Sequence, residues 1–524
     1  MIPVLDQVVT ATDGSGIAHL DWLRLLPALA PAAAALVILL LDALRPRLAR
    51  VHVAVAVVAL VVGAAAALPA ALGAASTPSK SLCLPSGTCL WTADPITGAL
   101  QMGALVATLA AVLLLLPRLL AAADDAPAAA EVQRGGAAVT LALMLGSTTG
   151  AVSVAAARDI PAWLVSLELA TLPVVALVAL RGTRASGHGA LSLLTTSLVS
   201  FAFLVLGSAL WLTATGDPTL SVAARAAAWG DPARRAVLVL GVVVLIAGLA
   251  FKLSAVPFHA WTPQAYGSGG LPIAALLASA SKIAALAALI GVLRPFTGLV
   301  GTAGAPHVVP FVLALLAVSS MLVGNVMALR QVDAVRLLAW STVAQAGWVV
   351  LPLTSMTALG HRAAAAYVLT YATATIVAFA AVSTVVVRHA GQPTTGEVAP
   401  GRRLTAFTGL VRTHPVAGVP LGLALFVLAG LPPGVIGLLA KVVALRPVVT
   451  AQLWPLAVVA VVAVILGIAA YVRWVAILLA GRTEGEPVPV GARIPVGAAT
   501  VLAGGAVLLV VLSLAPQLLL GLLE

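Results

Sequence analysis

The sequence predicts an all-α polytopic membrane protein with about 14 transmembrane helices, and three observations lead to that prediction. Of the 524 residues, 62% are hydrophobic and only 9% are charged, whereas soluble domains carry about 25% charged residues. Apolar runs of about 20 residues, the length that crosses a bilayer as a helix, recur along the whole chain. The loops between them are short, so we expect one transmembrane domain over residues 1–524.

The apolar runs give the expected helices in order, and their boundaries follow the loss of apolar residues at each end. The spans are 23–43, 51–74, 96–116, 136–156, 160–181, 188–213, 236–256, 272–293, 306–329, 335–354, 363–387, 415–446, 452–478 and 496–521. The longest loop, around 388–414, carries Gly, Pro and Arg and is typical of a flexible connector.

Two of these spans are interrupted. The seventh breaks at Pro257 after "FKLSAV", and the twelfth breaks at "GLPPG", residues 430–434. Proline removes a backbone donor, and a broken helix persists at membrane depth only where protein or a water-filled cavity satisfies the freed groups. Broken spans five apart fit a five-helix unit, helices 4–8, repeated as helices 9–13. The chain then divides into 1–130 with the first three helices, repeats at 131–295 and 300–480, and a last helix at 490–524.

The net charge of +11 is spread over short loops, so no basic domain is available for nucleic acid. Arginine clusters at 45–50 and 388–412 mark cytoplasmic loops by the positive-inside rule. An even number of spans then places both termini outside. The loop with Arg225, Arg234 and Arg235 argues for the opposite orientation.

Cys83 and Cys89 lie in "CLPSGTC", in a polar loop between the second and third spans. Their spacing fits neither a zinc site nor an iron–sulfur signature. With the first arginine cluster inside, this loop is outside, where a disulfide persists. A loop-closing disulfide and two free thiols both remain open, and neither carries redox chemistry.

Lysine is used sparingly, and its positions are unusual. Of the 28 basic residues, 24 are arginine and four are lysine. Lys80 lies in a loop, but Lys252, Lys282 and Lys441 all fall within apolar spans. Arginine stays protonated in proteins, whereas a buried lysine readily loses its proton. The pattern predicts buried groups that exchange protons.

Glu168, in "WLVSLELATLP", is the one acidic residue expected well inside a span. A charge at the bilayer centre costs from about 2.5 to more than 10 kcal/mol, so Glu168 needs a partner. Lys252 is the natural candidate, and we expect the two charged groups within roughly 4–8 Å, direct or through one water. Together with the lysines this describes a relay for a small cation, most simply the proton, because a charged lysine does not coordinate sodium.

Each of these residues also has a purely structural explanation. Lys252 and Lys441 lie near the ends of their spans and can extend to the interface; Lys282, in mid-span, is poorly placed to do so. Glu168 can serve as a structural hydrogen-bonding group, and His259 can simply end a helix. The polar run 341–348 fits close helix packing.

Three stretches together resemble one family. "FKLSAVPFHAWTP", "SASKIAALAALIGVLRPF" and "GNVMALRQVDAVRLLAWSTVAQAGW" resemble subunit N of respiratory complex I, the proton-pumping NADH:quinone oxidoreductase, within the antiporter-like membrane subunits. "LELATLP" and "LAGLPPG" occur in the same order as in that family. The resemblance implies fourteen helices, two inverted five-helix repeats, and discontinuous helices 7 and 12.

The resemblance also implies roles for individual residues. Those matching the family's proton-translocating positions are Glu168, Lys252, Lys282 and Lys441, with His259 and Gln345 on a possible proton path. The chain would hold no cofactor of its own; NADH, FMN, iron–sulfur clusters and quinone would bind to other subunits. Its partners would be other membrane subunits in a bacterial plasma membrane.

Some positions depart from the family pattern. "WTPQAYGSGG" stands where the family has "WTPDVYEGAP", Gln345 where it often has histidine, and "ALSLLTTSLVS" lacks a common lysine. These losses weaken the expected proton path at the tenth helix and the expected coupling contacts of the loop between the seventh and eighth helices. Two other functions therefore remain: a subunit of a cation/proton antiporter or membrane-bound hydrogenase-type complex, and a non-pumping scaffold paralogue.

Overall fold

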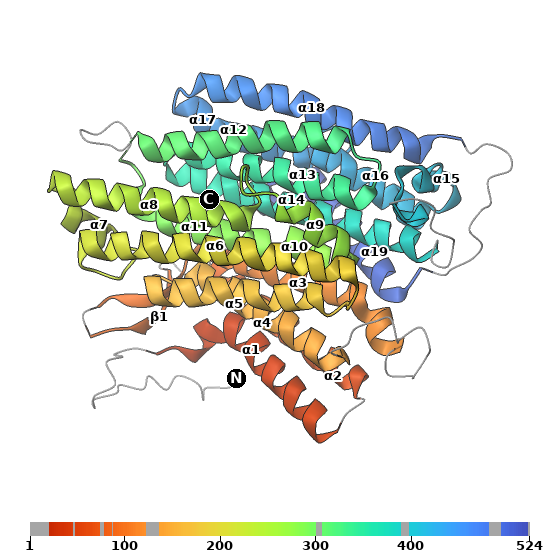
Figure 1. Ribbon diagram of the computed structural model, residues 1–524, viewed down its shortest axis with the longest axis horizontal. Coiled ribbons are helices and arrows are strands. Elements are labelled where there is room, and N and C mark those ends of the chain that lie inside the picture. Colours follow the sequence, from red (N-terminus) through yellow and green to blue (C-terminus); the bar gives the residue numbers. More distant parts are fainter. Residues whose placement is uncertain are drawn as a thin grey trace.

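The structure is a computed structural model that describes residues 20–45, 48–73, 78–85, 87–121, 136–299, 307–388, 398–481 and 494–521. Within these ranges, thirteen helices are long and apolar enough to cross a membrane, or up to 14 if one bent pair counts as a span. The predicted all-α polytopic membrane fold is therefore confirmed. The long helices lie side by side in one bundle (Figure 1).

The elements up to the first break comprise the first seven spans, a hairpin and one short helix. They are α1 (Trp22–Leu44), α2 (Ala49–Ala71), β1 (Ser79–Cys83), β2 (Cys89–Ala93), α3 (Pro95–Ala121), α4 (Gly136–Ala156), α5 (Ile160–Ala179), α6 (Arg184–Thr215), α7 (Val222–Trp229) and α8 (Pro232–Leu253).

The second half contains shorter pieces among long helices. They are α9 (Trp261–Ser268), α10 (Leu271–Ala278), α11 (Ala280–Leu293), α12 (Val308–Leu329), α13 (Ala334–Val350), α14 (Ala358–Arg388), α15 (Leu410–Thr413), α16 (Pro415–Ala429), α17 (Val435–Thr450), α18 (Trp454–Leu479), α19 (Val496–Leu514) and α20 (Gln517–Leu520).

Most carboxylates in the described ranges begin helices. A side-chain oxygen near a helix start accepts a hydrogen bond from an otherwise unpaired backbone N–H. The residues that do this are Asp21, Asp94, Asp159, Asp231 and Asp333. Glu168 differs because it lies inside α5.

Both predicted helix breaks are present. α8 ends at Leu253, Ser254 turns the chain with φ +65°, and α9 begins only at Trp261. α16 ends at Ala429, Gly430 has φ +78°, and α17 begins at Val435. Each break leaves backbone carbonyls at a helix C-terminus within the bundle, and these carbonyls need partners.

A third interruption was not predicted. The eighth span, expected as continuous over 272–293, is divided at Ser279 between α10 and α11. The Ser279 hydroxyl donates to the Ala275 carbonyl, 2.5 Å away. A serine that bonds back to its own helix bends it, and this bend lies just before Lys282.

The two ends of the bundle carry different loops. β1 and β2 form an antiparallel hairpin in which Cys83 pairs with Cys89, and a disulfide joins the two cysteines. Figure 1 places β1 and α7 at one end of the long helices and α15 at the other. The hairpin and the arginine of α15, Arg412, therefore lie on opposite sides of the bundle, as the charge pattern predicts.

The loop expected as a flexible connector is packed in its described part, so that expectation is wrong for residues 398–414. Arg402 Nη2 lies 2.7 Å from Asp333 Oδ2. Arg402 Nη1 also donates to the Gly267 carbonyl, 2.7 Å away. One arginine thus ties this segment to the start of α13 and the end of α9.

Candidate functional site

Glu168 and Lys252 form a direct ion pair inside the bundle. Lys252 Nζ lies 3.1 Å from Glu168 Oε1, closer than the predicted 4–8 Å, and the two side chains are 8% and 16% exposed. Lys252 Nζ also donates to Thr171 Oγ1 at 2.6 Å. Glu168 and Thr171 share one face of α5 because they are three residues apart. Sequence reasoning missed Thr171, although this spacing was visible.

Lys282, on α11, contacts the C-terminal end of α8, the helix that carries Lys252. Its Nζ donates to the Lys252 carbonyl at 2.8 Å and to Ser254 Oγ at 2.6 Å. Trp261 Nε1 donates to the neighbouring Phe251 carbonyl at 3.0 Å. At the end of α8, a lysine thus binds the Lys252 carbonyl and a tryptophan binds the Phe251 carbonyl, and the two lysines share one segment of backbone.

A small cavity adjoins this pair. Its volume is about 30 Å³, and a water molecule needs roughly 10–15 Å³. Its lining is mostly apolar, and its polar lining groups include Lys252, Thr171 of α5 and Ser197 of α6. Ser197 Oγ is buried and has no hydrogen-bond partner among the described residues. The cavity therefore offers Lys252 room for water beside hydroxyl groups.

Lys441 lies at the second break. Its Nζ donates to the carbonyls of Leu428, at 3.0 Å, and Ala429, the last two residues of α16. Its side chain is buried, as is that of Lys282. Lys441 thus contacts the end of α16 as Lys282 contacts the end of α8.

Gln345 belongs to this second centre. Its Nε2 donates to Tyr471 Oη at 3.0 Å and, at 3.5 Å, to the Leu428 carbonyl that also binds Lys441. Its Oε1 accepts from Tyr367 Oη at 2.5 Å. The polar run 341–348 therefore forms a hydrogen-bond network beside Lys441 and does more than let helices approach.

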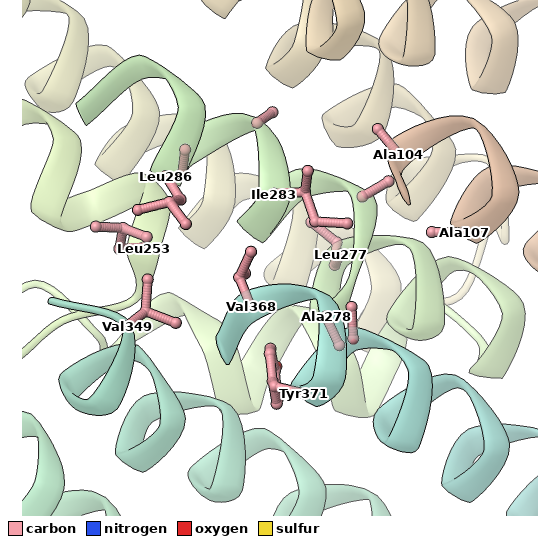
Figure 2. Close-up of a cluster of buried hydrophobic side chains, with 14 of the residues drawn as sticks. Ala104, Ala107, Leu253, Leu277, Ala278, Ile283, Leu286, Val349, Val368 and Tyr371 are labelled. Carbon is pink, nitrogen blue, oxygen red and sulfur yellow. The ribbon is translucent and has the colours of Figure 1, made fainter. Parts of the chain in front are cut away.

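Apolar side chains pack beside both centres. Leu286 lies one turn beyond Lys282 on α11, and Val349 one turn beyond Gln345 on α13. Figure 2 shows these two side chains in one buried cluster with Leu253 and Val368. The structure brings Glu168, Lys252 and Lys282 together, and it brings Lys441 and Gln345 together.

His259 joins neither centre. It lies half-buried in the turn between α8 and α9, and its ring centroid is 5.2 Å from that of Trp340 on α13. Its Nδ1 is buried without a hydrogen-bond partner among the described residues. The lysine contacts described above do not include this ring.

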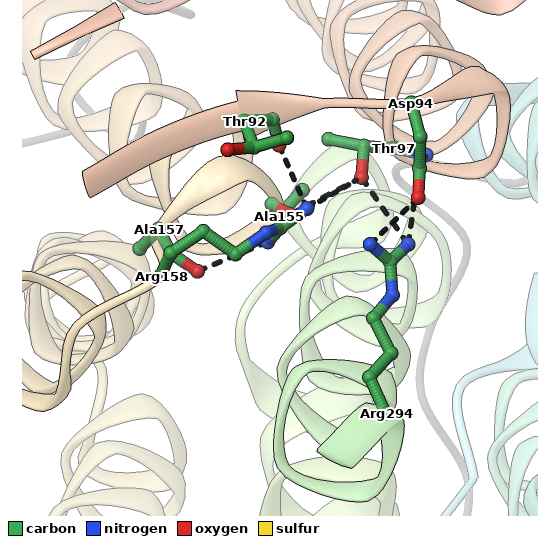
Figure 3. Close-up of polar contacts among 7 residues, drawn as sticks. All are labelled: Thr92, Asp94, Thr97, Ala155, Ala157, Arg158 and Arg294. Carbon is green, nitrogen blue, oxygen red and sulfur yellow. Dashed lines mark hydrogen bonds and ion pairs between the residues drawn. The ribbon is translucent and has the colours of Figure 1, made fainter. Parts of the chain in front are cut away.

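A further charged cluster, which sequence reasoning missed, lies near the hairpin (Figure 3). Arg294 Nη1 lies 2.6 Å from Asp94 Oδ2. Arg158 donates to the carbonyls of Thr92, Ala155 and Ala157. Burial alone would raise the pKa of Asp94, but the Arg294 guanidinium and a Thr97 backbone N–H lower it to about 2. Burial, followed by repulsion from Arg294, lowers the pKa of Arg158 to about 9.

Fold and site together define the class: a multi-span helical membrane protein with buried lysines at the ends of broken helices and a glutamate paired with one of them. The family model described as "NADH:quinone oxidoreductase/Mrp antiporter, TM" matches residues 157–467. This region contains all three buried lysines and Glu168.

Known proteins are similar over nearly the whole chain. NADH-quinone oxidoreductase subunit N 2 of Streptomyces griseus is 35% identical over 93% of this chain and 88% of its own. A chain of respiratory complex I from Thermus thermophilus with bound aureothin is 28% identical, with a TM-score of 0.74, over 94% of this chain and 98% of that one. A chain of the Mrp complex from Dietzia sp. DQ12-45-1b is 20% identical, with a TM-score of 0.79 over 96% of each chain, and shares the fold.

The chain therefore belongs to the NADH:quinone oxidoreductase/Mrp antiporter family of membrane subunits. Its curated relatives include further proteins named NADH-quinone oxidoreductase subunit N, such as that of Salinispora tropica, 36% identical over 88% of this chain and 86% of its own.

Proposed function

We propose that this chain is a proton-translocating, antiporter-like membrane subunit of a multi-subunit NADH:quinone oxidoreductase. Relatives that this chain matches over most of their length are named as subunits of NADH-quinone oxidoreductase. The observation that best supports the proposal is the Glu168–Lys252 ion pair at a helix break, 3.1 Å apart. Lys282 binds the carbonyl of the same Lys252.

The proposed transfer begins at this pair. A nearby carboxylate favours a charged lysine, whereas burial disfavours it. Moving Glu168 away from Lys252 therefore releases a proton, and moving it back takes one up. The break at 254–260 provides the joint for that movement, and the cavity beside Lys252 provides room for water.

The proton would then pass through Lys282 to Lys441, with Gln345 beside the second lysine and His259 on a possible entry path. Leu286 and Val349 lie beside these centres, and because aliphatic side chains do not carry protons, water would have to enter wherever such side chains line the route. The fourth to eighth spans, residues 131–295, and the ninth to thirteenth spans, residues 300–480, would form the two inverted repeats around this route.

The chemistry of NADH oxidation would belong to other subunits. This chain would hold no cofactor, and NADH, FMN, iron–sulfur clusters and quinone would bind elsewhere in the complex. Its partners would be other membrane subunits in a bacterial plasma membrane, with both termini outside. Quinone reduction would be coupled to proton pumping through the buried Glu and Lys residues.

An alternative is a subunit of a cation/proton antiporter or membrane-bound hydrogenase-type complex, because the Mrp complex chain shares the fold. A non-pumping scaffold paralogue would also have this architecture. The three possibilities differ in partners and in proton movement, so one experiment separates them.

The test purifies the tagged chain from its host membranes, identifies the copurifying subunits, and measures NADH-driven proton uptake by inverted vesicles. We expect NADH:quinone oxidoreductase subunits, and uptake that falls with Glu168→Gln. Copurification with antiporter subunits alone would favour the first alternative. Unchanged uptake by a fully assembled Glu168→Gln complex would favour the scaffold.

A further inference from the structure

Lys282 and Lys441 share an arrangement that their sequence context does not reveal. Each donates to carbonyls in the last turn of a helix that stops inside the bundle, Lys282 at α8 and Lys441 at α16. Each ammonium also faces a tryptophan ring. Lys282 Nζ lies 4.6 Å from the Trp261 ring centroid, and Lys441 Nζ lies 5.8 Å from that of Trp348.

Both contacts favour the charged form of the lysine. The C-terminus of a helix carries a partial negative charge that stabilises a cation. The face of an aromatic ring attracts an ammonium within about 6 Å, tryptophan most strongly, and the attraction grows when water is excluded. Water is largely excluded here, because Lys282 and Lys441 are only 2% and 6% exposed.

The surroundings hold these rings and lysines in place. The Trp261 indole N–H binds the Phe251 carbonyl, one residue before the carbonyl that binds Lys282. Trp348 stacks on Tyr367 with centroids 5.8 Å apart. Gly430 leaves room for Lys441, since a Cβ at this position would lie 2.9 Å from Nζ.

We propose that Trp261 and Trp348 are positioning residues that stabilise protonated Lys282 and Lys441 at the two helix ends and so set the pH at which each lysine gives up its proton. This inference rests on the proposed function. Other ionisable groups in these surroundings also contribute. Near Lys282 they are Glu168 on α5 and Lys252 on α8, with Tyr266 on α9 against the Trp261 ring and Tyr371 on α14 close to Tyr266. Near Lys441 they are Tyr367 on α14, which stacks on Trp348, and Tyr471 on α18, which binds Gln345.

The experiment measures NADH-driven proton uptake against external pH in vesicles that contain the assembled complex. Trp261→Leu and Trp348→Leu remove the aromatic face. Without it the protonated lysine is less stable, so the alkaline limb of the profile should move to lower pH by about half a unit to one unit. Trp261→Phe and Trp348→Phe retain a weaker aromatic face, and they should give smaller shifts in the same direction. If a leucine variant fails to assemble, the corresponding phenylalanine variant still tests the shift of the pH profile.

Trp474→Leu is the matched control. Trp474 is fully buried, and its ring contacts Phe407 rather than a lysine. This variant creates a cavity comparable to those of Trp261→Leu and Trp348→Leu, and it should leave the pH dependence of proton uptake unchanged. In a Lys282→Arg background, which removes the titrating amine, Trp261→Leu should add no further shift to any remaining profile.

The outcomes separate the inference from the proposed function. If Lys282→Ala and Lys441→Ala complexes pump like wild type, the proposed function fails and the inference fails with it. If those variants lose pumping while the tryptophan variants keep the wild-type profile, the inference alone is overturned. An equal shift in Trp474→Leu would also overturn it, because loss of packing would then explain the effect.

Discussion

Lys252 Nζ lies 3.1 Å from Glu168 Oε1 across 84 residues of sequence. The same lysine accepts a hydrogen bond on its carbonyl from Lys282. The charged group of Lys282 therefore binds directly to the backbone of Lys252. A change at Glu168 should be transmitted through a single residue to Lys282.

We predict that Glu168 and Lys252 act as a unit in proton transfer. Glu168→Gln and Lys252→Ala should each reduce proton uptake strongly, because each leaves a buried charge without its partner. The double variant should lose much less than the sum of the single losses. NADH-driven uptake by vesicles with equal amounts of complex measures this. Strictly additive losses would show that the two groups act independently, and Asp21→Asn at the exposed start of α1 is the control.

Lys282 should require an amine that can lose its proton. Lys282→Ala should lower proton uptake on the order of tenfold or more while assembly persists. Lys282→Arg keeps the charge but not the exchangeable proton, so it should not restore full uptake. Wild-type uptake in an assembled Lys282→Ala complex would exclude this residue from the path.

Gln345 should matter for stability as well as for the proton path. Gln345→Leu leaves the Tyr367 hydroxyl without its acceptor and Tyr471 without one donor. An unsatisfied buried polar group costs about 1–3 kcal/mol, so thermal unfolding of the purified protein in detergent should occur at lower temperature. Gln345→His keeps hydrogen-bonding atoms and should retain most of the stability. Equal unfolding temperatures for the Gln345→Leu variant and the wild-type protein would contradict a stabilising role of this hydrogen-bond network.

The Asp94–Arg294 pair predicts an acid-sensitive region beside the hairpin. The pKa of Asp94 is about 2 in the folded protein, below the ordinary value of 3.8. Its stabilising contribution is therefore complete above pH 3.8 and disappears as the pH falls towards 2. The loss is on the order of 2 kcal/mol.

Thermal unfolding of the detergent-solubilised protein between pH 6 and pH 2 checks this expectation. Asp94→Asn should be less stable than wild type at pH 6 and should lose less stability on acidification. Asp42→Asn, at a residue without an ion pair among the described residues, is the control. A parallel pH dependence in Asp94→Asn and wild type would refute the assignment.

The disulfide and its side of the membrane can be tested together. A membrane-impermeant thiol reagent added to unreduced intact cells should fail to label Cys83 and Cys89, and it should label both after mild reduction. Labelling without reductant would rule out the disulfide. No labelling even after reduction would contradict the external position of the hairpin.

The amino-acid sequence by itself determined the membrane class, the order of the spans and the two proline-associated breaks. These features follow from local composition: apolar length sets a span, and Pro257 or the "GLPPG" run prevents a continuous helix. The sequence also identified Glu168 and the three buried lysines as exceptional, because an ionised group in an apolar span is costly.

Only the tertiary structure decided which groups meet. The sequence predicted Lys252 as the partner of Glu168 within roughly 4–8 Å, direct or through one water, but the direct contact at 3.1 Å depends on how α5 and α8 pack. The bend at Ser279 and the joining of Asp94 to Arg294 across 200 residues were not predictable from local patterns. A lysine that needs acceptors can take them from any helix end within reach, so the choice of the α8 and α16 termini follows from packing.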